Sequence, residues 1–313
     1  MDMYQKRKLR QEKSADNTEQ SHKSSSINWY PGHMAKAKRL MLEDMKLIDV
    51  VVELVDARVP FSGKNPDIDG MAKGKSRVLL FNKSDMADPA VTARWKSRYE
   101  EQGFFVATVN AKNGSGLKAV EDCIMTACRE KLERDKKRGI QNRPVRAMVV
   151  GIPNVGKSTF INAYAGKAVA KTGNKPGVTK GKQWIRLNKN VELLDTPGIL
   201  WPKFENEMIG KRLAWIGSIN DDILIPTEMA SDILNFISIR YPGLIAEHYG
   251  IEEGNFETDH HGTELLDRVA VRRGCIRKGG EYDTERAAGI VIDDFRSVKI
   301  GKISLELPED ITE

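Results

Sequence analysis

The sequence predicts an α/β protein whose sheet is doubly wound and mostly parallel, followed by a second domain that is mainly α-helical. Over residues 50–195, apolar runs rich in β-branched residues alternate with helix-patterned stretches, which is typical of parallel sheets. Beyond residue 205 the pattern becomes helical, with few strand-like runs before KISLEL at 302–307. Because 313 residues suffice for about two domains, we expect them at 27–205 and 206–313.

The first expected elements are a polar arm, a helix and a buried strand. Residues 1–26 lack a core-forming pattern, so we expect a disordered arm. Between Met34 and Ile48, apolar residues recur at helical spacing. The run VVVELVDA at 50–57 is continuous and β-branched, which predicts a strand buried on both faces.

The remaining strands of the first domain are separated by charged, helix-compatible stretches. Further strands are expected at 77–81, 104–109, 145–150, 183–187 and 191–194. Helices are expected at 90–102 and 117–132, and a charged connector at 133–144. This order of strands and helices is the basis for the predicted sheet.

Composition places the chain among water-soluble globular proteins. It is 40% hydrophobic and 30% charged, and no apolar stretch approaches the roughly 18 residues of a membrane helix. Three cysteines and five scattered histidines give neither a disulfide framework nor a zinc spacing, which favours a reducing compartment. The arm has no apolar signal region and contains acids, so we expect a cytoplasmic protein without a membrane partner.

The net charge of +6 is unevenly distributed. Residues 206–313 carry 12 basic and 21 acidic side chains, so the positive charge belongs to residues 1–205. Residues 166–190 hold seven basic side chains and no acid, and residues 129–146 hold eight against three. Such clusters attract polyphosphates, above all nucleic acid, although any one of them alone could be a solvated surface.

GIPNVGKST at 151–159 is a phosphate-binding loop with the pattern G-x-x-x-x-G-K-[ST]. It follows a predicted strand and precedes a helix, which is the context this motif requires. Glycine lets backbone N–H groups turn toward phosphates, and the helix N-terminus favours negative charge. The expected nucleotide contacts from this loop are Asn154, Val155, Gly156, Lys157, Ser158 and Thr159. Lys157 would reach the β- and γ-oxygens, and Ser158 would hold Mg²⁺.

DTPG at 195–198 follows the last predicted strand of this domain. Asp195 suits Mg²⁺ coordination at the strand end, and the Gly198 N–H can meet a γ-phosphate. Between the two motifs, Thr179 is the candidate for a switch hydroxyl that closes on Mg²⁺. An ordinary turn residue is the alternative for Thr179.

NKSD at 82–85 follows a strand and resembles a guanine-binding loop. Asp85 can accept hydrogen bonds from N1–H and N2–H₂ of guanine, Asn82 can brace the phosphate loop, and the Lys83 stem can lie over the base. Ser84 completes the loop. The next strand leads into VNAK at 109–112, where the Ala111 N–H could meet O6, although Asn110 departs from the usual serine. Adenine would leave the carboxylate unmatched, which disfavours an ATPase.

These motifs occur in the order guanine loop, base-backbone loop, phosphate loop, switch threonine and DTPG. The phosphate loop usually comes first, so the order predicts a circularly permuted P-loop GTPase domain, cut after DTPG. The DTPG switch then continues through residues 199–204 into the helical domain. We expect this segment to transmit nucleotide state.

The permuted order resembles that of the ribosome biogenesis GTPase A family, together with NWYPGHMAKA (28–37), LVDAR (54–58), KPGVT (175–179) and DTPGILWPKF (195–204). The resemblance covers the chain from about Ile27. It implies a bacterial cytoplasmic GTPase that uses GTP, GDP and Mg²⁺. It also implies a late precursor of the large ribosomal subunit and its ribosomal RNA as partners, rather than DNA or a membrane.

The resemblance also implies two residue roles. Ile199 stands where Ras-like enzymes orient water with Gln, so hydrolysis should be slow alone and stimulated by the ribosomal particle. His33 is a catalytic candidate beside Lys157, Thr179 and Gly198; contacting RNA or capping the helix are its alternatives. Asn154 resembles a K⁺ ligand, or else forms a turn.

Two interpretations of function remain open at this point. One is an enzyme whose GTP hydrolysis times release from an assembling large subunit. The other is a GTP-dependent RNA-binding scaffold whose hydrolysis is incidental. In either case, the basic stretch 268–278 of the helical domain could face phosphates or pair with neighbouring acids.

Overall fold

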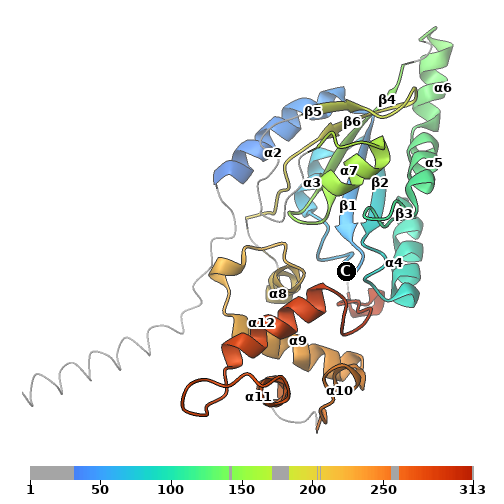
Figure 1. The fold of residues 1–313 in the computed structure, drawn as a ribbon. Coiled ribbons are helices and arrows are strands. Elements are labelled where there is room, and N and C mark those ends of the chain that lie inside the picture. Colours follow the sequence, from blue (N-terminus) through green and yellow to red (C-terminus); the bar gives the residue numbers. More distant parts are fainter. Residues whose placement is uncertain are drawn as a thin grey trace, which may run out of the picture.

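The computed structural model describes residues 32–140, 143–170, 183–202, 204, 206–254 and 261–311. The predicted arm 1–26 and the switch candidate Thr179 therefore lie outside the described residues. The fold consists of a sheet flanked by helices and a helical part beyond one end of that sheet (Figure 1).

The predicted doubly wound, mostly parallel sheet is confirmed. Its six strands have the order β3-β2-β1-β4-β6-β5. Their bounds are Val50–Asp56 for β1, Ser76–Asn82 for β2, Phe105–Thr108 for β3, Val145–Gly151 for β4, Gln183–Arg186 for β5 and Val191–Asp195 for β6. All neighbouring strands are parallel except β5, which runs antiparallel to β6 at the edge. The carboxyl ends of β1, β2, β3, β4 and β6 therefore meet at one edge of the sheet, where ligands bind in such folds.

Seven helices of the described chain belong to the sheet-containing part. They are α2 (Gly32–Asp44), the 3₁₀ helix Met45–Leu47, α3 (Pro66–Met71), α4 (Pro89–Glu101), α5 (Leu117–Ala127), α6 (Arg129–Lys137) and α7 (Lys157–Ala165). In Figure 1, α4, α5 and α6 line one side of the sheet. α5 contacts β1, β2 and β3, whereas α7 contacts β4 and β6. The strands between are buried, as the β-branched runs predict.

The predicted connector 133–144 is wrong in its first part, because α6 extends to Lys137. Its residues are mostly strong helix formers, and Lys131 pairs with Asp135 one turn later at 3.2 Å. None of the side chains of α6 is buried. The helix is tied to the body of the protein by Leu132, which packs partly buried against the core, and by Lys131, whose Nζ lies 2.8 Å from Asp49 Oδ1, and it projects its other charged groups into solvent.

The second part of the chain is mainly helical. It comprises α8 (Glu207–Trp215), a 3₁₀ helix (Asp221–Ile223), α9 (Pro226–Arg240), α10 (Leu244–Tyr249), α11 (His261–Arg272), α12 (Thr284–Arg296) and a last 3₁₀ helix (Pro308–Asp310). α9 packs against both α11 and α12. Buried leucine, isoleucine and valine side chains at helical spacing form this core. No helix in the described parts of the chain is both long and apolar enough to cross a membrane.

The run at 302–307 does not form the expected strand. It is an extended segment whose backbone meets loops of the sheet-containing part: Leu305 N–H donates to Arg58 O at 2.8 Å, and Trp95 Nε1 donates to Glu306 O at 2.9 Å. The Glu306 carboxylate accepts bonds from Ser62 Oγ at 2.7 Å and Arg212 Nη1 at 3.1 Å. Apolar and polar residues of the segment are buried alike, and these bonds anchor it to both parts of the chain.

Candidate functional site

The predicted guanine, base-backbone, phosphate and DTPG loops follow β2, β3, β4 and β6 at the same edge of the sheet. They lie far apart in sequence, but the strand order places them side by side. The loops therefore come together at one edge of the sheet, although the phosphate loop follows the guanine loop in the chain instead of preceding it.

Asn82 connects three of these segments. Its side chain is buried at the end of β2, where Nδ2 donates to Val155 O at 2.8 Å. Its Oδ1 accepts a bond from the Ala111 N–H at 3.1 Å. Gly156 has φ +97°, and a Cβ there would lie 2.5 Å from Asn82 Nδ2, so only glycine permits this contact. Asn82 therefore holds the base-binding and phosphate-binding loops together.

Lys83 and Asp85 differ in their surroundings. Lys83 has a backbone φ of +57°, and its Nζ lies 3.0 Å from Asp56 Oδ2. Asp85 is exposed, which leaves its carboxylate accessible to a base. Ser84 N–H donates to Val109 O at 3.2 Å and so joins the loop to the end of the neighbouring strand.

Asn110 explains why the departure from serine is tolerated. Its buried Oδ1 accepts bonds from Lys112 N–H at 2.9 Å and Asn113 N–H at 3.2 Å. The side chain thereby closes the turn after Ala111 by local hydrogen bonds. The base-backbone loop keeps a defined shape without serine.

The phosphate loop is shaped by close backbone approaches. A Cβ at Gly151 would lie 2.5 Å from Leu54 O on β1. Lys157 opens α7, and its Nζ donates to Gly151 O at 3.0 Å and Ile152 O at 2.8 Å. Burial lowers the pKa of Lys157 to about 8, against the opposing effect of the Asp195 carboxylate. Phosphate oxygens could replace these two carbonyls as acceptors.

Asp195 is a buried carboxylate with one oxygen that makes no hydrogen bond within the described residues. It is buried at the end of β6, and its Oδ1 has no hydrogen-bond partner among the described residues. Burial raises its pKa to about 6, although Lys157 and the Thr196 N–H act in the opposite direction. With the partly exposed Ser158 it offers oxygen ligands of the kind Mg²⁺ takes. These residues fit the predicted metal.

The DTPG segment lies directly against the phosphate loop. A Cβ at Gly198 would be 2.8 Å from Lys157 Nζ and 3.0 Å from Pro153 Cα. The following Ile199 is buried, and its carbonyl accepts a bond from Asn65 Nδ2 at 3.2 Å. Glycine at 198 therefore allows an approach that any side chain would prevent.

Asn154 makes an unexpected contact with the helical part. Its Nδ2 donates to Gly217 O at 2.7 Å, in the turn after α8. Arg296 of α12 supports the same turn, because its Nε donates to Trp215 O at 2.9 Å. The sequence offers no signal for this link, since 63 positions separate Asn154 from Gly217.

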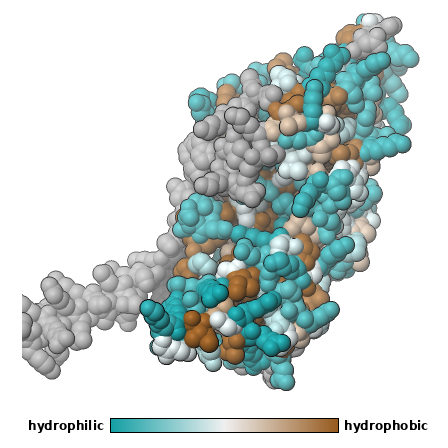
Figure 2. All heavy atoms as spheres, in the orientation of Figure 1, coloured by the Kyte–Doolittle hydropathy of each residue, from teal (hydrophilic) through white to brown (hydrophobic). Residues whose placement is uncertain are grey.

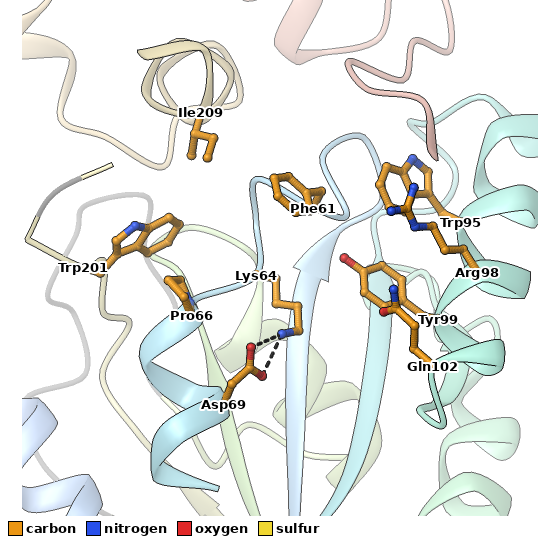
Figure 3. A pocket seen from close by; sticks show the side chains of 10 residues that line it. All are labelled: Phe61, Lys64, Pro66, Asp69, Trp95, Arg98, Tyr99, Gln102, Trp201 and Ile209. Atoms are coloured by element: carbon orange, nitrogen blue, oxygen red, sulfur yellow. Dashed lines mark hydrogen bonds and ion pairs between the residues drawn. The ribbon is translucent and has the colours of Figure 1, made fainter. Parts of the chain in front are cut away.

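A hollow of about 240 Å³ lies beside the segment that follows DTPG (Figure 3). Figure 3 shows Trp201 and Pro66 on one side and Trp95, Arg98 and Tyr99 of α4 on the other, with Phe61 between them. Lys64 and Asp69 are paired at its floor. No residue of the nucleotide motifs lines it, so it is a feature of the junction and not of the nucleotide site.

Three predicted features stay untested or are weakened by contacts. His33 belongs to α2, but its side chain is outside the described atoms, as is Thr179. In the basic stretch 268–278, Arg268 donates to Glu252 O at 2.6 Å and Arg272 to Tyr249 O at 3.3 Å. Both bonds go to backbone carbonyls, whereas Arg277 makes the expected pairing with an acid, Glu285, at 3.0 Å.

Comparison with known proteins identifies similar chains. Residues 146–240 match the family described as 50S ribosome-binding GTPase. Ribosome biogenesis GTPase A of Bacillus licheniformis is 45% identical over 285 residues, covering 91% of this chain and 99% of that protein. The protein of that name from Thermotoga maritima is 35% identical over 286 residues, covering 91% and 96%. The structure of GNP-bound YlqF from T. maritima is similar with a TM-score of 0.60 at 31% identity, over 88% of this chain and 100% of that one.

Proposed function

The chain belongs to the ribosome biogenesis GTPase A family, and on that premise we propose that it binds ribosomal RNA on a late precursor of the large ribosomal subunit. GTP hydrolysis would time maturation of that particle and release of the protein. The coarser statement, a GTPase of ribosome biogenesis that binds GTP and GDP, follows from the family itself. The observation that carries the nucleotide site is the bridge by Asn82 between the base and phosphate loops.

Each loop has a distinct task in this proposal. Asp85 and the Ala111 N–H recognise guanine, while the backbone of 154–159 and Lys157 hold the phosphates. Lys157 exchanges the carbonyls of Gly151 and Ile152 for phosphate oxygens. Mg²⁺ held by Ser158, Asp195 and Thr179 would neutralise charge on the β- and γ-phosphates. The Gly198 N–H senses the γ-phosphate.

The RNA partner is supported by α6. Its exposed Arg129, Lys136 and Lys137 lie at the end of the molecule where Figure 2 shows hydrophilic side chains, with some hydrophobic ones between them. Basic side chains at such a surface would neutralise RNA phosphates, and release of the counterions condensed on the RNA would favour binding. We propose the cytoplasm as the site of this activity. A GTP-dependent scaffold is the second candidate, favoured by the apolar, buried Ile199 where a water-orienting group is expected.

Replacing His33 with Ala should remove stimulation of turnover by the particle, a loss of about 10-fold or more, while the Kd for GTP stays unchanged. The reason is that Ile199 has no polar side-chain atom, so water must be oriented from elsewhere. Single-turnover hydrolysis with saturating precursor particles measures this, with His22→Ala as a matched histidine control. Unchanged turnover, or weaker particle binding that accounts for the whole effect, would refute the catalytic role.

Potassium is the proposed partner of Asn154. The bond to Gly217 uses the amide nitrogen, which leaves Oδ1 as the atom for a cation beside the phosphates. Hydrolysis should therefore be faster in K⁺ than in Na⁺ at equal ionic strength, and Asn154→Ala should remove the difference. Steady-state rates in the two salts provide the measurement. Equal rates for the unmodified protein would exclude this site.

A further inference from the structure

Lys83 is fixed at both ends. Its backbone has a φ of +57°, a conformation that L residues seldom adopt, and it follows Asn82, whose side chain bonds to two other loops. At the other end, Nζ lies 3.0 Å from Asp56 Oδ2. The four-carbon stem between these anchors cannot swing freely. Its direction is set by the position of Asp56.

Asp56 is itself rigidly placed. It ends β1 in direct register with Asn82 on β2, and its side chain is fully buried. Arg58 binds both carboxylate oxygens, with Nε to Oδ1 at 2.9 Å and Nη2 to Oδ2 at 2.8 Å. The Arg58 N–H adds a third bond at 3.1 Å to Oδ1. This is the forked geometry that makes arginine–carboxylate pairs directional.

The carboxylate of Asp56 stays ionised despite its burial. Burial alone would raise its pKa, but the charges and hydrogen bonds of Arg58 and Lys83 together hold it well below the usual range. One anion thus serves two cations. Arg58 already satisfies both oxygens, so the ion pair with Lys83 is not needed to neutralise Asp56. The ion pair therefore matters more for the position of Lys83 than for the charge of Asp56.

We propose that Asp56 is a positioning residue for guanine recognition, which holds the Lys83 stem where it lies against the face of the base. This inference deepens the proposed GTP site and rests on it. A lysine held over an aromatic ring contributes through contact and cation–π attraction. No nucleotide atom need touch Asp56. Its effect on affinity would pass entirely through Lys83.

The alternative is that Asp56 only completes a buried ion cluster. Arg58 also packs toward α12, with its guanidinium 5.8 Å from the Phe295 ring, and its Nη1 has no partner within the described chain. Loss of Asp56 could therefore disturb the junction with the helical part. A single substitution cannot separate these two roles, whereas a double-mutant cycle can.

The test is a cycle of Asp56→Asn and Lys83→Met in the full-length protein, with the Kd for GDP and for tripolyphosphate measured by calorimetry. Asp56→Asn should weaken GDP binding about 10-fold and leave tripolyphosphate binding unchanged. In the Lys83→Met background, Asp56→Asn should add no further loss. Asp69→Asn, which removes a charge from a partly exposed ion pair, is the matched control and should leave both constants unchanged.

Two results would overturn the positioning role. One is an equal loss of GDP affinity from Asp56→Asn with and without Lys83. The other is a parallel loss of tripolyphosphate binding, which would indicate damage to the whole site. Failure of the base-site assignment itself is recognised separately, because Asp85→Asn would then leave GDP affinity unchanged. The ribosomal role does not enter this experiment.

Discussion

Asp195→Asn is expected to reduce GTP hydrolysis by about 100-fold or more and at the same time to stabilise the nucleotide-free protein. The loss of activity follows from the proposed role, because an amide replaces a charge in the proposed phosphate and metal site, where single electrostatic groups contribute about 10²–10³ in rate. The gain in stability follows because Oδ1 of Asp195 is buried without a partner among the described residues. Function and stability oppose each other at this residue.

The stability change has a defined dependence on pH. Burial raises the pKa of Asp195 from 3.8 to about 6 in the folded protein. Its favourable contribution is therefore complete below the unfolded pKa and is lost as the pH rises through about 6. At pH 7.5 the unmodified protein bears a cost of at most about 3 kcal/mol that Asp195→Asn avoids. Below about pH 4 the difference between the two proteins should vanish.

Thermal unfolding of both proteins from pH 4 to 8, without nucleotide, measures this effect alongside steady-state hydrolysis. Glu192→Gln is the control on the same strand, since its carboxylate is partly exposed and forms only a long ion pair with Arg146, at 3.7 Å. A lower melting temperature for Asp195→Asn at pH 7.5 would contradict the burial argument. Near-normal hydrolysis would contradict the role at the phosphates.

Asp85→Asn is expected to lower GTP affinity by about 10⁴-fold and to create binding of xanthosine triphosphate. Guanine offers two donors, N1–H and N2–H₂, to the carboxylate, whereas the amide would set its own donor against one of them. Sites built on such paired bonds reject mismatched bases by about this factor. Xanthine carries a carbonyl in place of the amino group and so matches Asn. The specificity should move from one base to the other.

Competition binding with the triphosphates of guanosine, xanthosine and adenosine gives the readout. Asp122→Asn is the control. Asp122 is exposed on α5, so this substitution removes the same charge outside the guanine loop. Retention of normal GTP affinity would disprove guanine recognition by Asp85. Loss of GTP binding without any gain for xanthosine triphosphate would point to a damaged loop instead.

The parts of the fold that the sequence predicts well are those that depend on short, local residue patterns. β-branched runs marked the buried strands, and the motifs at their ends marked the four loops, because parallel strands bring their carboxyl ends to one edge. The order of motifs was enough to infer the permutation, and the strand order agrees with it. α6 was missed in part because charged residues resemble a connector until their helix propensity is considered.

Long-range contacts could not be predicted from one sequence. Glu306 bonds to Ser62 across 244 positions, so nothing local distinguishes its segment from a strand. Asn154 reaches Gly217 by a side chain whose motif position suggests only the nucleotide. The LVDAR stretch alone assigns no role to Asp56. Its contact with Lys83 depends on the register of β1 and β2, which pairs Asp56 with Asn82. An acid ending the strand next to the guanine loop was the available signal.

The most direct measurement is GTP hydrolysis in K⁺ buffer with and without late precursors of the large ribosomal subunit, using mature subunits as the control. A timed-release GTPase predicts stimulation by the precursor of about 10-fold or more, where activation in trans can reach 10³–10⁵. Tight GTP-dependent binding of the precursor without any stimulation would contradict it and support the scaffold.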